Sequence, residues 1–242
     1  MNENVDRRVL GAFAFVDAIT NGVIEVPLEV QCADWTIRPN RRAVYVIFDG
    51  PGMSAATAEF VPIASSWPAS VQMEISVSDP SGAYLPRRAQ IKGIPAQAPT
   101  VQNVTLFTSP ASGTAPNWFI LYASVQNSAT SSGLPWTVLQ ITTAASTTPV
   151  ATGMSDARGE ALLAVTGLKA QIATSGTGYA AVTTSATVRA WYDPAFASQP
   201  AAWVPDPDDV LTNLTNTTLH SATQTTSLAP GSAATLRIPI AI

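Results

Sequence analysis

The 242-residue sequence contains one cysteine and one histidine, and only 12% of its residues are charged. With Cys32 alone, no disulfide can form within the chain, and the single His220 excludes most hydrolytic triads and His-based metal sites. A Cys32–His220 pair is the one Cys-His nucleophile available, but the two residues fall in different halves of the sequence. We expect a buried thiol, on an apolar face with Leu28 and Val30, and a surface imidazole.

Excess positive charge and long apolar runs are also missing. The net charge is −4 and the pI is about 4.9, so nucleic acid is not an expected partner. No stretch approaches the ~20 apolar residues of a membrane-spanning helix, and residues 1–8 are polar with no signal-peptide core behind them. We expect cytoplasmic synthesis without membrane insertion, which is compatible with later release as part of a particle. The basic pairs at 7–8, 41–42 and 87–88 are interpreted as solvated strand ends.

What the sequence does contain is typical of β structure. Hydrophobic residues make up 46% of the chain, and Ser, Thr, Ala and Pro are abundant. Few charges combined with many Thr and Pro residues favour β-sandwiches rich in turns. The same composition suits a surface partly covered by partner proteins, and it equally suits an ordinary β protein with a neutral surface.

The chain is organised around residues 152–167, TGMSDARGEALLAVTG. A polar turn at 155–159 lies between two apolar runs, and Gly159 can adopt the positive φ that closes a hairpin. The run at 160–165 is too short and too tightly bounded by glycines for a stable helix. We therefore predict a hairpin over 153–165, with a strand after the turn.

Further strands are predicted from β-branched and alternating runs. A Thr-Asn-Gly turn at 20–22 should return the first strand to the second, and Asp-Pro-Ser-Gly at 79–82 forms another turn. The alternation over 71–77 marks the clearest half-buried strand, and the apolar run at 43–48 indicates a core strand. Residues 53–70 are expected to form a loop with a short strand at 60–63, and 174–178 a polar loop. The remaining predicted strands cover residues 8–17, 26–32, 84–92, 101–107, 117–125, its partner 135–142, 182–192 and 234–240.

The order of these signals suggests an internal repeat. A strand ending in Asp-Pro occurs at 77–80 and again at 192–194, and each half closes with an alternating strand. Residues 109–115, SPASGTA, have linker composition. The predicted organisation is a first β-sandwich at 1–108, a linker at 109–115, and a second β-sandwich at 116–242. The second carries an insertion at 206–220, predicted to form a short helix with Asp206 as N-cap.

Acidic residues and tryptophans are the remaining candidates for a site. Asp206, Asp208 and Asp209 offer oxygen ligands for calcium, but they lack the glycine and distal glutamate of a calcium loop, and helix capping explains them more simply. Turn formation accounts for four further aspartates, namely Asp34, Asp49, Asp79 and Asp193. A sugar-binding platform would need tryptophans stacked on one exposed face, whereas those predicted in strands (Trp118, Trp136 and Trp191) suit a core or an interface. The other three are Trp35, Trp67 and Trp203. We therefore predict no catalytic, cofactor or metal residues.

Two resemblances rest on specific stretches. The segment 155–161, SDARGEA, followed by an apolar strand and Gly167, resembles the carboxypeptidase-regulatory-like family of transthyretin-like β-sandwiches. That resemblance implies a seven-strand module without catalytic residues. The first half has the same outline but shows Pro-Asn-Arg-Arg at 39–42 in place of the turn. The whole chain, including 77–88 and 106–111, is similar to tandem-sandwich proteins of phage-tail-like contractile injection systems, which implies a structural component.

These observations predict two tandem Ig/transthyretin-like antiparallel β-sandwiches without enzymatic activity or cofactor. The leading hypothesis is a structural component of a contractile injection particle at the baseplate, cap or a sheath-adjacent position. It would dock on sheath, tube or baseplate proteins through exposed strand edges and neutral faces. The alternative is a carbohydrate- or surface-binding module. A third hypothesis, an enzyme that uses Cys32 or the Asp206 cluster, has the least support.

Overall fold

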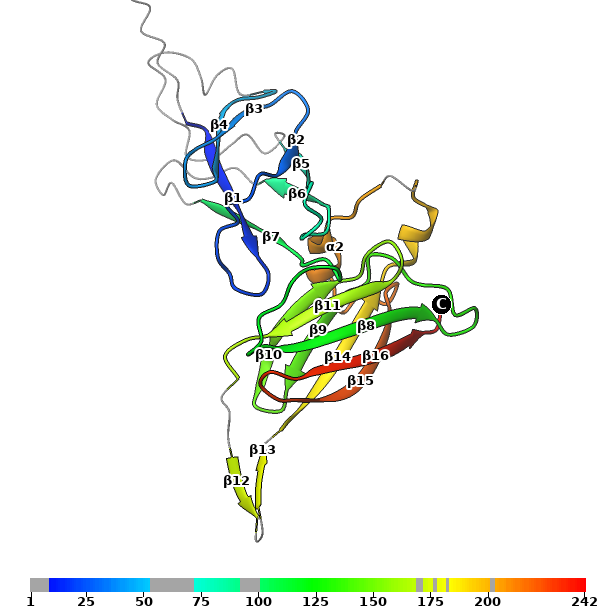
Figure 1. The fold of residues 1–242 in the computed structure, drawn as a ribbon. Coiled ribbons are helices and arrows are strands. Elements are labelled where there is room, and N and C mark those ends of the chain that lie inside the picture. Colours follow the sequence, from blue (N-terminus) through cyan, green and yellow to red (C-terminus); the bar gives the residue numbers. More distant parts are fainter. Residues whose placement is uncertain are drawn as a thin grey trace, which may run out of the picture. The chain divides into compact units, whose positions relative to one another are not determined.

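The structure is a computed structural model that describes residues 9–52, 72–91, 101–168, 172–175, 178–181, 183–200 and 203–242. Strands dominate it (Figure 1), and the predicted all-β sandwich class is confirmed. In these ranges the helical elements are one α-helix, α2 (Pro207–Leu211), and one 3-10 helix, η1 (Pro194–Ser198). Neither has the length and apolar character needed to cross a membrane.

The chain divides into two units that alternate briefly along the sequence. Unit 1 comprises Met1–Asp17, Asn21–Pro80 and Pro86–Leu106, and unit 2 comprises Ala18–Thr20, Ser81–Leu85 and Phe107–Ile242. In each unit most of the described strands form two sheets.

Unit 1 contains seven described strands. One sheet has the order β3-β4-β1-β7 and the other the order β2-β5-β6. The strands are β1 (Gly11–Asp17), β2 (Glu29–Gln31), β3 (Thr36–Pro39), β4 (Val44–Asp49), β5 (Met73–Ser78), β6 (Arg87–Ile91) and β7 (Gln102–Leu106).

Both sheets of unit 1 contribute fully buried apolar side chains. Phe13 and Phe15 come from β1, while Met73 and Ile75 come from β5, where the predicted alternation is confirmed. The buried Arg87 of β6 links the two sheets. Its Nη1 donates a hydrogen bond of 2.7 Å to Thr105 O on β7. This arginine was predicted to be a solvated strand end, and that prediction is wrong.

Unit 2 has seven strands in two sheets and a separate two-stranded hairpin. The sheet orders are β11-β8-β16 and β10-β9-β14-β15, and β12 pairs with β13. The strands are β8 (Phe119–Asn127), β9 (Val138–Thr143), β10 (Ser146–Met154), β11 (Glu160–Val165), β12 (Ile172–Ser175), β13 (Gly178–Ala181), β14 (Thr184–Tyr192), β15 (His220–Leu228) and β16 (Ala233–Ile240).

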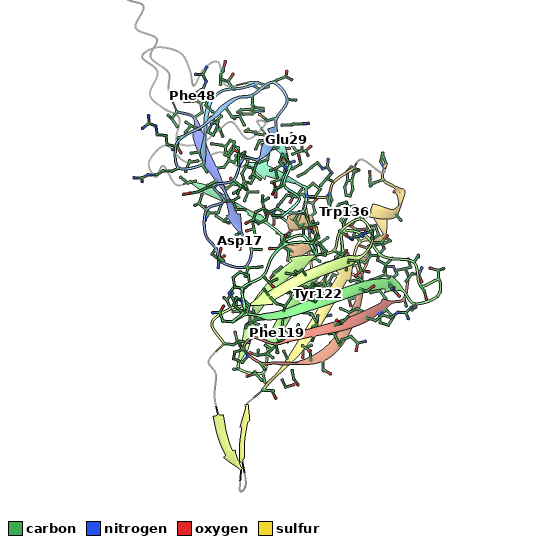
Figure 2. All side chains as sticks on the ribbon, viewed as in Figure 1. Asp17, Glu29, Phe48, Phe119, Tyr122 and Trp136 are labelled. Carbon is green, nitrogen blue, oxygen red and sulfur yellow. The ribbon has the colours of Figure 1, made fainter. Side chains whose placement is uncertain are left out.

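The core of unit 2 lies between these two sheets. Leu121 and Leu163 enter it from one sheet, and Ile141 and Val188 from the other. Side chains on β8 alternate about the sheet, so that Phe119 is buried in this core whereas Tyr122 is 39% exposed on the opposite face (Figure 2). Full burial of a large apolar side chain stabilises the folded state by about 1.5–3 kcal/mol. This core is therefore the main source of stability in unit 2.

The two units share their main strand pairings. In each, the first strand pairs antiparallel with the fourth (β1 with β4, β8 with β11) and parallel with the last (β1 with β7, β8 with β16). The pairs β5–β6 and β14–β15 are likewise equivalent and antiparallel. The third strand differs, because β3 pairs with β4 whereas its counterpart β10 pairs with β9.

The turn after the first strand also recurs, 110 residues further along (Asp17 to Asn127). Asp17 N donates to Gly22 O and Asn21 N to Asp17 O, and the same two bonds join Asn127 with Ser132 and with Ser131. Asn21 and Ser131, at equivalent positions, have φ values of 56° and 58°. The two halves therefore use one turn geometry with little sequence in common.

The predicted hairpin at 153–165 is wrong in its pairing, although both strands and the turn form. β10 belongs to the sheet of β9, and β11 to the sheet of β8, so the turn is an arch between the two sheets. Ser155 N donates to Thr137 O in one sheet, while Val125 N donates to Gly159 O in the other. β11 is buried on both faces, which suits a strand packed from two sides rather than the half-exposed arm of a hairpin.

The strands predicted at 26–32 and 135–142, each expected to pair with the strand before it, also cross to the other sheet. Residues 23–24 and 133–134 each begin to pair with the preceding strand, through the bridges Val16–Val23 and Gln126–Gly133. Beyond them the chain crosses over, so that β2 pairs with β5, and β9 pairs with β10 and β14. In unit 2 the crossing follows Trp136, whose φ of 58° bends the backbone away from β8.

Other local predictions have mixed outcomes. The loop predicted at 174–178 is wrong at 174–175 and at 178, which belong to the paired strands β12 and β13, and its centre at 176–177 lies outside the described residues. The predicted core strand at 43–48 forms as β4, but of its side chains only Ile47 is fully buried. The short strand predicted at 60–63 lies outside the described residues. The predicted helix start at Asp206 is confirmed.

The arch depends on glycine and on a buried hydroxyl. Gly159 has φ +85°, and a Cβ there would lie 2.5 Å from Val125 O and 2.7 Å from Leu134 N. A Cβ on Gly133 would overlap the carbonyl oxygen of Arg158. Beside these glycines, the fully buried Ser155 Oγ donates a hydrogen bond to Leu134 O at 2.9 Å. It also accepts one from Thr137 N, just before β9.

We predict that Gly159→Ala lowers the free energy of unfolding of unit 2 by about 2–4 kcal/mol, because it adds a backbone clash to a left-handed φ. Gly167→Ala is the matched control, since Gly167 has φ +70° with nothing within 4 Å of its Cβ position. The control should cost about 1–2 kcal/mol. Urea unfolding measures both, and equal losses for the two variants would contradict the proposed clash.

Candidate functional site

Cys32 and His220, which were not expected to form a catalytic pair, lie in different units. Cys32 lies in unit 1, just after β2, and is half-buried, not fully buried as predicted. Its Sγ is 3.7 Å from Trp35 O, and burial raises the pKa of the thiol. His220 begins β15 in unit 2, with Nδ1 2.7 Å from Ala241 O. A raised pKa reduces the thiolate fraction, which is the opposite of what a nucleophilic cysteine needs.

The acidic cluster acts as a helix start. Asp206 Oδ1 accepts a hydrogen bond of 3.1 Å from Asp208 N, and Pro207 occupies the first helical position. Asp208 and Asp209 lie in the first turn of α2, where the helix dipole favours negative charge. Within the described part of the chain, no group of three or more His, Cys, Asp or Glu residues is arranged to hold a metal ion.

The predicted turn aspartates support their local backbone. Asp49 Oδ1 accepts from Gly50 N at 2.9 Å, and Asp193 Oδ1 caps η1 by accepting from Ala195 N at 2.9 Å. Asp34 has φ 60° in the turn before β3. Asp156, in the arch of unit 2, accepts from two backbone N–H groups as well as from a guanidinium.

None of the five described tryptophans is classed as exposed. Trp118 and Trp136 lie in turns before β8 and β9, so their predicted positions inside strands are wrong, whereas Trp191 lies in β14 as predicted. Trp136 (Figure 2) packs against a cluster that contains Met154, and the Trp203 ring lies 5.0 Å from that of Phe196. Trp35 covers Gly50 in unit 1. Trp67 lies outside the described residues.

Trp191 marks one end of the outer face of the sheet β10-β9-β14-β15. It packs with Val138 and Val210, under side chains of the insertion that follows β14. The Arg189 guanidinium lies over its ring, 5.0 Å from the centroid. The buried Nε1 has no hydrogen-bond partner among the described residues.

The rest of that outer face is polar and almost uncharged. Inward side chains of β14 and β15 belong to the core, so the alternate residues face outward in opposed pairs. We call six of them the hydroxyl face: Ser185, Thr187, Ser221, Thr223, Thr225 and Ser227. Arg189 is the one Asp, Glu, Lys or Arg in the four strands of this sheet. The hydroxyl face is the candidate functional surface.

The composition of the sequence indicated a neutral polar surface, but it did not show where on the fold that surface lies. The alternating Ser and Thr of β15 stand in the sequence as SATQTTS, which contains no charged or large apolar residue to attract notice. Only the pairing with β14, with Ser185 opposite Ser227 and Thr187 opposite Thr225, shows that the hydroxyls form one surface.

Comparisons with known proteins identify no family. No family model and no curated protein matches the sequence. Among solved structures, the chain is similar to the Bacillus anthracis TIE protein, with a TM-score of 0.27 and 9% identity over 97% of this chain and 34% of that chain. It is also similar to a leucine-rich repeat protein from Bacteroides thetaiotaomicron, with a TM-score of 0.20 and 8% identity over 97% of this chain and 26% of that one. The chain thus spans about a third and a quarter of those two lengths, and similarities this low carry no argument.

We predict that Cys32 reacts slowly with iodoacetamide, because burial raises its pKa and the thiolate is the reacting form. The pH midpoint of the alkylation rate should lie above the ordinary value of about 8.5. The urea-unfolded chain is the control, because its thiol is solvated. A folded-state midpoint at or below that of the unfolded chain would restore the nucleophile hypothesis.

We predict that Trp191→Phe changes the free energy of unfolding by less than about 1 kcal/mol, since the lost Nε1–H makes no hydrogen bond to a described residue. Trp191→Ala, which also removes the packing with Val138 and Val210, should cost about 3–5 kcal/mol. Thermal unfolding monitored by circular dichroism compares the two. Similar losses for both variants would mean that the indole N–H has a partner.

Proposed function

We propose that the chain is a non-enzymatic structural component of a phage-tail-like contractile injection particle, at the baseplate, cap or a sheath-adjacent position. It acts by docking its β-sandwich modules on other proteins of the particle. The observation that carries this proposal is the hydroxyl face, a polar surface with little charge on a sheet whose other side packs in the core. Ser and Thr hydroxyls can donate and accept, so such a face accommodates a protein partner without burying unpaired charge.

The architecture supports the tandem part of the proposal. Among the described residues, each unit has seven strands in its two larger sheets, the number expected for the carboxypeptidase-regulatory-like module that residues 155–161 resemble. The shared pairings and the recurring turn at Asp17 and Asn127 support two copies of one module with divergent loops. Tandem sandwiches of this kind are the feature that the chain shares with the particle components it resembles.

The tryptophans favour protein docking over glycan binding. A glycan platform uses exposed aromatic rings on one face, whereas Trp191 is buried and the other four described rings are half-buried. The Trp191 ring is buried, and the Arg189 guanidinium lies over it. The carbohydrate-binding alternative therefore has no surface of its own in the described structure.

The test is affinity purification of the tagged full chain, expressed at its native level in its own host. Mass spectrometry and negative-stain imaging then identify what accompanies it. We expect sheath and tube proteins in the eluate and tail-like particles on the grid. A lone chain in the eluate, together with retention on a glycan array, would contradict the proposal.

A matched pair of variants examines the surface. Gln140→Glu/Thr142→Glu places two charges on the outer side of β9, beside the hydroxyl face, where both residues are half-buried. Ala111→Glu/Gly113→Glu adds the same charge at exposed positions before β8. If docking uses this sheet, the first variant loses the particle proteins and the second retains them. Equal retention would place the docking surface elsewhere.

A further inference from the structure

β15 has a nine-residue edge that pairs with no described strand. β15 is the last strand of its sheet, at the border of unit 2 in Figure 1. All nine of its residues are in register with β14, with no bulge between Thr184–Leu228 and Tyr192–His220. Its opposite edge pairs with no described strand, so its outward N–H and C=O groups are available to another chain.

The other edge strands carry features that discourage such pairing. Charges or proline occur on β3 (Arg38, Pro39), β6 (Arg87, Arg88) and β16 (Arg237, Pro239). At the far edge of the same sheet, β10 contains Pro149 and a register shift. The strands β2, β7, β11, β12 and β13 have three, five, six, four and four residues. These are the means by which natural sheets avoid edge-to-edge association.

β15 has none of these features. Its sequence, HSATQTTSL, contains no Pro, Gly, Lys, Arg, Asp or Glu, and its one ionisable group is His220 at the first position. Ser221, Thr223, Thr225 and Ser227 are exposed. A nine-residue edge without a charge or a break is a template for strand addition.

The sequence of β15 indicates which strand suits this template. Read from either end about Gln224, the stretch 221–227 is nearly the same: SATQTTS forwards and STTQTAS backwards. An antiparallel copy centred on Gln224 places Ser221 opposite Ser227 and Thr223 opposite Thr225. A two-fold interface requires this kind of self-complementarity, in which each position meets its counterpart from the same patch.

We propose that β15 pairs antiparallel with β15 of a second copy of this chain, centred on Gln224. The pairing joins two four-stranded sheets into one continuous sheet across the dimer. Each Thr223 lies opposite the partner's Thr225, and the hydroxyl faces of both copies become one surface. Thr–Thr pairs are favourable cross-strand neighbours, and the seam contains no charge repulsion. The dimer is a property of the purified chain and does not depend on the particle.

The experiment is sedimentation equilibrium of the purified full chain over about 1–100 μM, a range that brackets micromolar association. The variant Thr223→Glu/Thr225→Glu sets like charges opposite each other twice across the two-fold axis. Its dimer should dissociate with a Kd raised about ten-fold or more. Within one chain the glutamate at 223 lies beside Arg189, its neighbour on β14, so the fold itself is not expected to suffer.

Two further variants test the register and the location. Thr223→Glu/Thr225→Lys places opposite charges across the same axis, and we expect its Kd to return to within about three-fold of the wild-type value. Ser185→Glu/Thr187→Glu carries the same added charge one strand inward on β14 and should dimerise like the wild type. Circular dichroism of each variant establishes that it is folded.

A wild-type chain that stays monomeric at every concentration would overturn the proposal. So would an opposite-charge variant that is as weak as the double-glutamate variant, because it would place position 223 away from the partner's 225. Weakening by Ser185→Glu/Thr187→Glu equal to that of the double-glutamate variant would also contradict pairing at the β15 edge. Since only the purified chain is used, these outcomes are separate from the presence or absence of particle proteins in the affinity purification.

Discussion

The arch at residues 155–159 is the constraint on which unit 2 depends. In five residues the chain leaves the sheet of β9 and enters the sheet of β8, so the spacing of the two sheets is set locally. This requires backbone segments to approach more closely than a Cβ allows at Gly133 and Gly159. Ser155 then satisfies buried backbone groups at the crossing, which would otherwise cost about 1–3 kcal/mol each.

The edge strands of the sheets differ in how well they are protected against pairing with another strand. Open sandwiches have edges, and an unprotected edge invites another strand. In the described edge strands other than β15, short length, proline, a bulge or charge discourages pairing with another strand. β15 alone combines length, neutrality and an uninterrupted register with its neighbour. The hydroxyl face leads directly to that edge, so the surface proposed for docking and the edge proposed for self-association are continuous.

The two units show how a shared set of strand pairings tolerates divergence. The parallel pairing of first and last strands, and the turn at Asp17 and Asn127, recur without similar side chains. The difference lies in the third strand and in the insertions. In unit 2 the stretch after β14 forms η1 and α2 and covers Trp191, whereas in unit 1 the equivalent β5–β6 connection is the short turn at Gly82.

Much of the local structure could be predicted because it depends on neighbouring residues. Alternation identified β5, Asp206 and Pro207 marked the start of α2, and Gly159 indicated a positive φ. The sheet to which each strand belongs could not be predicted, because a tight turn can join strands of one sheet or of two facing sheets. Most strand positions, the turns, the helix cap and the scarcity of charge follow from the sequence alone. The arch, the buried position of Arg87 and the hydroxyl face follow only from the tertiary structure, because each depends on hydrogen bonds between residues far apart in the chain.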